Sequence, residues 1–129
     1  MIVLDASAVV ELLLGTTRAA LIDARIRRGV SLHAPAVLDL EVTHAIRRLC
    51  AIHQTSEDRG ARAITDLGAL AVRRYPHTPL LERIWQLRAN LTAYDAAYIA
   101  LAEALRAPLV TRDRRLAQTR GHRARIDLV

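Results

Sequence analysis

The chain begins with Met1-Ile2-Val3-Leu4-Asp5-Ala6-Ser7, and the interpretation of the whole sequence starts from this stretch. Three apolar residues without a polar break predict a short strand that is buried in the middle of a parallel sheet. Asp5 follows this strand directly, and residues 6–14 predict a helix ended by Gly15. In an open α/β sheet the carboxyl end of a buried strand borders the ligand crevice. Asp5 is therefore the first candidate member of a metal-binding acidic cluster.

The size and composition of the chain predict one globular domain over residues 1–129. A chain of this length buries about two-thirds of its unfolded surface. Its content of 52% hydrophobic and 25% charged residues is typical of a folded protein. Aromatic residues make up 3% and Phe is absent, so Leu, Ile, Val and Ala must build the core. This scarcity argues against the base-stacking platforms of many single-strand binders.

The charge of the chain is +6, and all 19 basic residues are Arg. The absence of Lys excludes a P-loop lysine and Schiff-base chemistry. A basic surface on a small protein suggests a polyanionic partner. The single cysteine, Cys50, excludes a disulfide framework and a thiolate metal site. Asp5 and Glu11 interrupt the apolar start, which lacks a basic leader, so we expect no signal peptide, no membrane span and a cytoplasmic location.

Strand-like and helix-like segments alternate along the chain. Thr16 or Thr17, Thr55 (with Asp58) and Thr92 are candidate helix caps, and Pro35 suits a first helical turn. The apolar periodicity predicts a second helix, which begins after Thr16 or Thr17 and ends near residue 28, and further helices over 36–51, 56–70, 80–91 and 93–105. Strands are predicted over 30–34, 71–75, 108–111 and 124–129. This alternation predicts an α/β/α sandwich with a mainly parallel sheet of roughly five strands.

Three further acids join Asp5 as site candidates. Asp113 follows the strand 109–111, and parallel neighbouring strands would bring it to the same sheet edge as Asp5. Glu41 lies beside the apolar stripe of its helix, where an ionised carboxylate is costly unless it is paired or metal-bound. Asp95 lies in the first turn of the helix 93–105. The four acids are thus candidates for one cluster.

Each acid also has a purely structural explanation. Asp113 could cap the turn that follows it, and Asp95 could complete a capping box that Thr92 begins. Glu41 could form an ion pair with Arg47 or Arg48. Three other acids are interpreted as ordinary surface or pairing residues: Glu11, Asp39 and Glu103.

Four motifs together resemble the PIN domain, and within it the VapC-type toxins of type II toxin–antitoxin pairs. They are Asp5-Ala6-Ser7-Ala8, Leu40-Glu41-Val42 followed by Arg47-Arg48, Thr92-Ala93-Tyr94-Asp95-Ala96-Ala97-Tyr98, and Thr111-Arg112-Asp113-Arg114-Arg115-Leu116. The resemblance covers the whole chain in order. Two positions depart from the pattern: His44 stands where many relatives carry a small polar amide, and Arg114 and Arg115 replace a further acid of some members.

The resemblance implies an endoribonuclease that uses Mg²⁺, for which Mn²⁺ can substitute. In this interpretation Asp5, Asp95 and Asp113 coordinate the metal, and Glu41 completes the catalytic set by orienting or deprotonating the attacking water. Carboxylate and water oxygens are the ligands that these hard cations prefer.

Five further residues receive supporting roles. The hydroxyls of Ser7 and Thr111 are expected to hold carboxylates or metal-bound waters in place, although both could be simple cap and strand-end groups. Arg112, Arg114 and Arg115 flank Asp113 and are expected to contact RNA phosphates, with a solvated basic turn as the alternative.

The resemblance also implies partners for the protein. It implies a homodimer, a cognate antitoxin whose tail crosses the catalytic groove, and a higher assembly of the two. The apolar faces of the helices 36–51 and 56–70 are the expected docking surfaces. The alternative is a catalytically inactive PIN-fold module that binds RNA or a partner. A phosphatase with Asp5 as nucleophile is disfavoured, because Ser7 occupies the place of a second Asp and the chain has no lysine.

Overall fold

The fold is built on a five-stranded sheet in which every neighbouring pair of strands is parallel. The structure is a computed structural model that describes residues 1–26 and 29–129. The strand order is β3-β2-β1-β4-β5, with the first strand of the chain at the centre. The strands are β1 (Ile2–Leu4), β2 (Leu32–Pro35), β3 (Val72–Tyr75), β4 (Leu109–Thr111) and β5 (Ile126–Leu128). The predicted parallel sheet is therefore confirmed.

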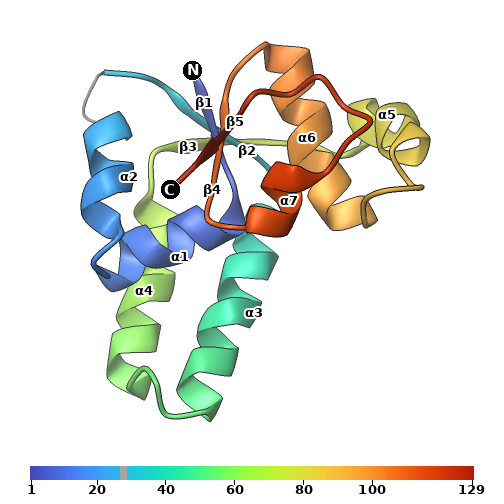
Figure 1. The fold of residues 1–129 in the computed structure, drawn as a ribbon. Helices are drawn as coiled ribbons and strands as arrows, with labels where there is room; N and C mark the ends of the chain where they lie inside the picture. The colour runs from blue at the N-terminus through green and yellow to red at the C-terminus, as the bar shows by residue number, and fades with distance from the viewer. Residues whose placement is uncertain (27–28) are drawn as a thin grey trace.

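Helices cover both faces of this sheet, as Figure 1 shows. In that view α1 and α2 lie on one side and α5 and α6 on the other, while α3 and α4 project away from the sheet as a pair. The helical segments are α1 (Ala6–Leu14), α2 (Ala19–Ile26), α3 (Leu38–Ala51), α4 (Glu57–Ala69), η1 (Thr78–Leu80), α5 (Leu81–Gln86), α6 (Ala93–Leu105) and α7 (Arg114–Gln118). The α/β/α sandwich predicted from the sequence is confirmed.

The core consists of aliphatic residues and alanines, as the composition requires. Val3 and Leu4 of the central strand are fully buried. The middle of α6, from Ala96 to Ala102, is buried at every position, and this helix contacts β1, β2 and β4. Small alanine side chains allow the helix to lie close against the sheet, and Tyr98 is its largest fully buried side chain. The helix that carries Asp95 is thus held rigidly.

The α3–α4 pair depends on one close contact between helices. A Cβ atom at Gly60 would lie 2.6 Å from the Sγ of Cys50 and 3.3 Å from a methyl of Ile46. A larger residue at position 60 would therefore force the Cys50 side chain to move where α4 crosses α3. The buried stripe of α3, formed by Leu38, Val42 and Ile46, faces this contact and the core.

Several predicted helix starts are wrong by a few residues. Thr16 does not cap α2, because its hydroxyl donates to the carboxylate of Glu11 instead; the expected end of that helix near Arg28 lies outside the described residues. Pro35 is the last residue of β2 and not part of a helix. The hydroxyl of Ser56, one residue after Thr55, accepts the capping hydrogen bond of α4 from the Arg59 amide.

The predicted helix over 80–91 is divided into shorter pieces. A 3-10 turn over Thr78–Leu80 leads into α5, which ends at Gln86. The backbone then continues in turns. Their backbone amides donate hydrogen bonds to carbonyls three or four residues earlier, such as Arg88 N to Trp85 O at 3.2 Å. The next helix needs an extended cap residue, Thr92, so the chain must leave the helical conformation before it. The cap at Thr92 and the helical turn after Asp113 are as predicted.

The strand order places a crevice beside the central strand. From β1 the chain builds the sheet outward through β2 and β3, then returns to add β4 on the other side of β1. Such a reversal separates the loops that follow the two strands and leaves a ligand crevice at their carboxyl ends. Of the helices in the described residues, none is long and apolar enough to cross a membrane.

Candidate active site

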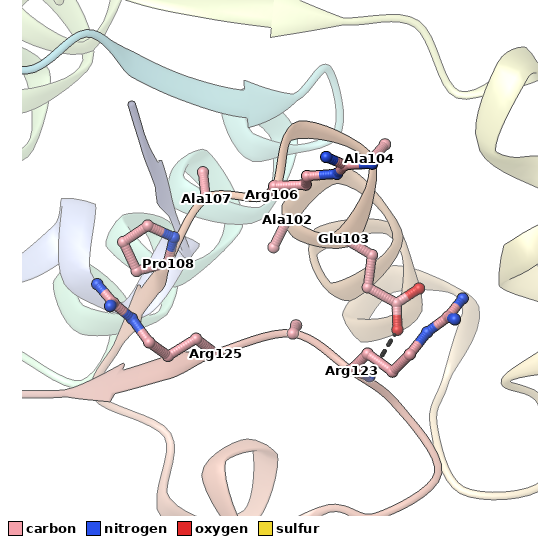
Figure 2. A pocket seen from close by; sticks show the side chains of 9 residues that line it. Ala102, Glu103, Ala104, Arg106, Ala107, Pro108, Arg123 and Arg125 are labelled. Atoms are coloured by element: carbon pink, nitrogen blue, oxygen red, sulfur yellow. Dashed lines mark hydrogen bonds between the residues drawn. The ribbon is translucent and has the colours of Figure 1, made fainter.

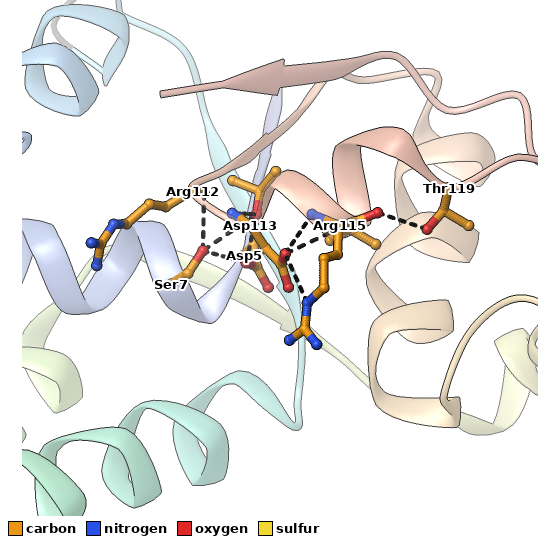
Figure 3. A network of polar contacts seen from close by, with 8 residues as sticks. Asp5, Ser7, Arg112, Asp113, Arg115 and Thr119 are labelled. Carbon is orange, nitrogen blue, oxygen red and sulfur yellow. Dashed lines mark hydrogen bonds and ion pairs between the residues drawn. The ribbon is translucent and has the colours of Figure 1, made fainter.

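Asp5 and Asp113 meet at the carboxyl edge of the sheet, as predicted. Leu4 pairs with Val110 across β1 and β4, and the Asp5 amide donates to the carbonyl of Val110 at 3.0 Å. Asp113 follows two residues after the end of β4. Figure 3 shows the two aspartates side by side between α1 and α7. The adjacency of these strands in the sheet is what brings together residues that are far apart in sequence.

Two hydroxyls hold the carboxylate of Asp5, which is only 6% exposed. Ser7 Oγ donates to Oδ2 at 2.5 Å, and Thr111 Oγ1 donates to the same oxygen at 2.8 Å. These hydroxyls in turn accept the amides of Arg112 and Asp113, each at 3.0 Å. Both donors use Oδ2, which leaves Oδ1 free to act as a ligand. Ser7 and Thr111 thus connect both strand ends through hydrogen bonds, the geometry expected of residues that position a metal ligand.

Asp113 also caps the short helix α7. Its Oδ1 accepts the amides of Arg115 at 2.8 Å and Leu116 at 3.3 Å. The capping role considered from the sequence is therefore present. It occupies one carboxylate oxygen and fixes the side chain at the mouth of the crevice, so the other oxygen can still bind a cation.

Asp95 reaches the same edge from the first turn of α6. Its amide donates to Thr92 Oγ1 at 3.2 Å, so the predicted cap is present. Burial raises the pKa of the Asp95 carboxyl, and the negative charges of Asp5 and Asp113 raise it further, with Thr92 and Arg115 opposing them. These repulsions show that three acids from different elements lie within electrostatic range of one another.

Glu41, on α3, accepts a hydrogen bond from a buried tyrosine. The hydroxyl of Tyr98, a side chain with no exposed surface, donates to Glu41 Oε2 at 2.6 Å. Burial raises the pKa of Glu41, as do Asp5 and Asp95, while the Tyr98 hydrogen bond lowers it. Glu41 takes part in no ion pair with Arg47 or Arg48 among the described residues.

A cavity of about 930 Å³ opens over this acidic edge. Asp5, Glu41 and Asp113 line its polar end, and Asp95 lies next to it, as its interaction with Glu41 shows. The structure therefore brings all four predicted acids to one place. Within the described residues, no group of three or more His, Cys, Asp or Glu side chains lies close enough together to hold a metal ion as the side chains stand. The negative charges of the acids repel one another, which favours this separation while no cation is bound.

Glu11 has a position that the sequence analysis did not assign. It is a buried carboxylate, 6% exposed, that accepts a hydrogen bond from Thr16 and forms an ion pair of 2.5 Å with Nη1 of Arg112. Arg112 in turn donates its amide to Ser7. The pair ties α1 to the loop that carries Asp113. Glu11 is thus a pairing acid as expected, although it is not on the surface.

A basic cavity of about 990 Å³ adjoins the acidic one. Asp113 and Ser7 line both cavities. The Arg115 side chain, 95% exposed, lies 3.9 Å from Asp113 Oδ1 and extends away from the loop in Figure 3. Five arginines line this cavity: Arg18, Arg48, Arg112, Arg114 and Arg115. Guanidinium groups therefore lie directly beside the carboxylates.

The sequence analysis assigned no partner to two side chains that lie beside the acids, for different reasons. Tyr98 lies one helical turn after Asp95, a spacing that could have marked it as a neighbour of the site. Glu11 lies one turn after Ser7 on α1, but its partner Arg112 comes about a hundred residues later. Only the three-dimensional structure reveals such a pair.

The chain belongs to the PIN domain family, whose model matches residues 2–121. It is 48% identical to ribonuclease VapC12 of Mycobacterium tuberculosis over 129 residues, covering 100% of this chain and 99% of the relative. It is 44% identical to ribonuclease VapC1 of the same organism over 128 residues, covering 98% and 96%. The crystal structure of PAE2754 from Pyrobaculum aerophilum aligns with a TM-score of 0.72 at 26% identity, covering 98% of this chain and 83% of that one. The resemblance to VapC-type PIN domains is thereby confirmed.

Proposed function

We propose that this protein is an endoribonuclease that depends on Mg²⁺ or Mn²⁺ and acts as a growth-inhibiting toxin. The observation that supports this is the gathering of four carboxylates from four separate elements at one edge of the sheet, in a chain whose full-length relatives are named ribonucleases. An all-oxygen donor set suits a hard divalent cation. Such a cation would also neutralise the repulsion among the acids.

Asp5, Asp95 and Asp113 are the residues that would hold the metal. The Ser7 and Thr111 hydroxyls donate to Oδ2 of Asp5 and not to Oδ1. The amides that Asp113 caps donate to its Oδ1 and not to its Oδ2. Each aspartate therefore keeps one oxygen with which it could bind the metal. A bound Mg²⁺ would act as a Lewis acid at the scissile phosphate and lower the pKa of a bound water. The chain's own contribution is to orient the ligands, which Ser7 and Thr111 do for Asp5.

Glu41 is the residue that would accept a proton from the attacking water. The pKa of Glu41 is raised toward neutral pH, and a general base is most effective when its pKa lies near the working pH. Tyr98 opposes that rise through its hydrogen bond and also fixes the orientation of the carboxylate. Burial keeps the pKa of Tyr98 far above its usual range, so its hydroxyl stays a donor.

Arginines beside the acids would bind the RNA phosphates. Arg114 and Arg115 line the basic cavity next to Asp113 and are exposed. Arg112 is a candidate as well, but its guanidinium already lies on Glu11, so its first role is to fix the loop. Positive groups are needed here because the acidic cluster would otherwise repel a polyanion.

A cognate antitoxin would silence the enzyme by occupying the acidic cavity and its apolar extension. The cavity continues from Glu41 along α3, where the side chain of Leu40 is 73% exposed. The other apolar lining residues are Ala6, Val10, Val37, Ala45, Leu49, Ile52 and Tyr94. An amphipathic segment fits such a surface. The apolar faces of α3 and α4 are also the proposed contacts of a homodimer and of a higher assembly with the antitoxin.

RNA cleavage by matched variants tests the proposal. Asp5→Ala, Asp95→Asn and Asp113→Asn should each abolish Mg²⁺-dependent cleavage and toxicity without unfolding the protein. Asp66→Asn, an exposed acid on α4, is the control and should cut RNA normally. Retained metal-dependent cleavage by purified Asp95→Asn would contradict the proposal. An inactive binding module would give no cleavage even in the natural sequence, and its RNA affinity would not require Asp113.

A further inference from the structure

A third cavity, of about 690 Å³, lies at the opposite edge of the sheet from the acids. It opens between the end of α6 and the segment that leads into β5, as Figure 2 shows. Pro108, directly before β4, lines it, whereas Asp113 follows the same strand. At about 3.3 Å per extended residue, the two sites are roughly 16 Å apart along the strand direction.

Three exposed arginines give this cavity a positive lining: Arg106, Arg123 and Arg125. Arg106 and Arg125 form no ion pair within the described residues. Among the described residues that line the cavity, Glu103 is the one acid. Its two oxygens are already bound by Arg83, at 2.7 and 3.0 Å, and by the amide of Arg123 at 2.8 Å. The hydrogen bond from Arg83 lowers the pKa of Glu103, so this carboxyl stays ionised, but its charge is compensated by the ion pair with Arg83 and does not neutralise the other arginines of the cavity.

A row of arginines connects this cavity to the acidic site. Seven arginines fall between residues 106 and 125, with Asp113 as the only acid among them. The chain from Asp113 to Arg125 runs from the carboxyl edge of the sheet back to the start of β5. Exposed arginines occur along this whole segment: Arg114, Arg115, Arg120, Arg123 and Arg125. A phosphate backbone crossing the segment would therefore meet positive charge at both ends and between them.

We propose that the cavity of Arg106, Arg123 and Arg125 is a second phosphate-binding site, which holds the backbone of a structured RNA away from the scissile bond. This rests on the proposed function, because it takes RNA as the substrate. Phosphate contacts of this kind add affinity and orientation without reading sequence. A folded RNA can span both edges of the sheet, whereas a short single strand bound at the acids cannot. The site would thus favour structured substrates over short ones.

The test compares a triple variant, Arg106→Glu/Arg123→Glu/Arg125→Glu, with the control Arg62→Glu, an exposed arginine on α4. Both are made in an Asp95→Asn background so that RNA is bound but not cut. The probes are bulk transfer RNA and a single strand of about three nucleotides, which at about 3.4 Å per stacked nucleotide is too short to reach from the acids to this cavity. Fluorescence anisotropy over a salt series gives the affinity and the slope of log K against log salt.

The triple variant should lose about tenfold or more in affinity for transfer RNA, and its salt slope should fall by about two. The short strand and the control should bind as before. Unchanged transfer RNA affinity, or an equal loss for both probes, would overturn the proposal. A site that binds inorganic phosphate but does not affect transfer RNA would be a small-anion site and would also overturn it.

Two further measurements keep the test decisive. The triple Arg→Gln variant removes the charge without reversing it and should show a smaller loss in the same direction, even if the Glu variant folds poorly. Cleavage of RNA by the protein with Asp95 intact is measured separately. Arginine-dependent binding without any cleavage would support the second site while contradicting the nuclease, so the two proposals can fail independently.

Discussion

Tyr98→Phe tests whether the buried tyrosine tunes the proposed general base. The substitution keeps the ring in its fully buried position and removes only the hydroxyl that donates to Glu41 at 2.6 Å. This hydrogen bond lowers the pKa of Glu41 against the effects of burial and of Asp5 and Asp95. Its loss should therefore raise that pKa.

The size of the effect follows from the strength of the bond. A hydrogen bond to an ionised group contributes about 1.5–3 kcal/mol, and 1.36 kcal/mol corresponds to one pKa unit. Some of this is recovered by relaxation, so we expect a displacement of about one pH unit. If Glu41 must be ionised to accept a proton, activity rises with pH through its pKa. The acidic limb of the profile should then move to higher pH in Tyr98→Phe.

The assay is the pH dependence of kcat/KM for RNA cleavage, together with carbon NMR titration of labelled glutamate in metal-free protein. Tyr94→Phe is the matched control, because Tyr94 is 61% exposed and its hydroxyl takes part in no hydrogen bond among the described residues. Melting curves show whether the variants are folded. An acidic limb that does not move in Tyr98→Phe, or moves equally in Tyr94→Phe, would refute the role assigned to Tyr98.

Three other predictions concern residues around the same edge. Asp95→Asn should raise the Tm of the metal-free protein at neutral pH, because a folded-state pKa that is raised means that ionisation of Asp95 costs stability. The gain should disappear once the pH falls below the ordinary pKa of 3.8, and an equal or lower Tm at neutral pH would count against the repulsion. Thr111→Val should lower kcat by about tenfold or more, because Asp5 loses one of its two hydroxyl donors, while Thr111→Ser should restore most of it in the same cleavage assay. Glu11→Gln should destabilise the fold by about 1–3 kcal/mol in urea unfolding, because it weakens the ion pair between the buried Glu11 carboxylate and the half-exposed Arg112. A loss no larger than that of the surface variant Glu57→Gln would show that the pair is not structural.

The sheet was predictable because its sequence signal is local. Ile2–Leu4 and Leu109–Thr111 are short apolar runs that each lead into an acid, and parallel pairing alone then brings Asp5 and Asp113 together. The helices with clear caps were also predictable, as at Thr92. The predicted helix 80–91 was wrong because its apolar periodicity continued through turns that carry similar residues.

The remaining features of the site depend on tertiary contacts that no local pattern encodes. The pairing of Glu11 with Arg112 and the arginine cavity at the start of β4 and β5 join segments far apart in the chain. The guanidinium of Arg112 forms an ion pair with Glu11, which its place beside Asp113 in the sequence does not indicate, and its contact with RNA stays a prediction. The positions of the acids after the strands predicted which edge of the sheet they share. They did not predict the direction in which each side chain points.

Calorimetric titration with Mn²⁺ tests most directly whether the four acids form a metal centre. The protein should bind Mn²⁺ with an affinity in the micromolar-to-millimolar range. Asp95→Asn should lose that binding, while Asp66→Asn should retain it. A protein that takes up no Mn²⁺, or whose uptake is the same after Asp95→Asn, would contradict the account.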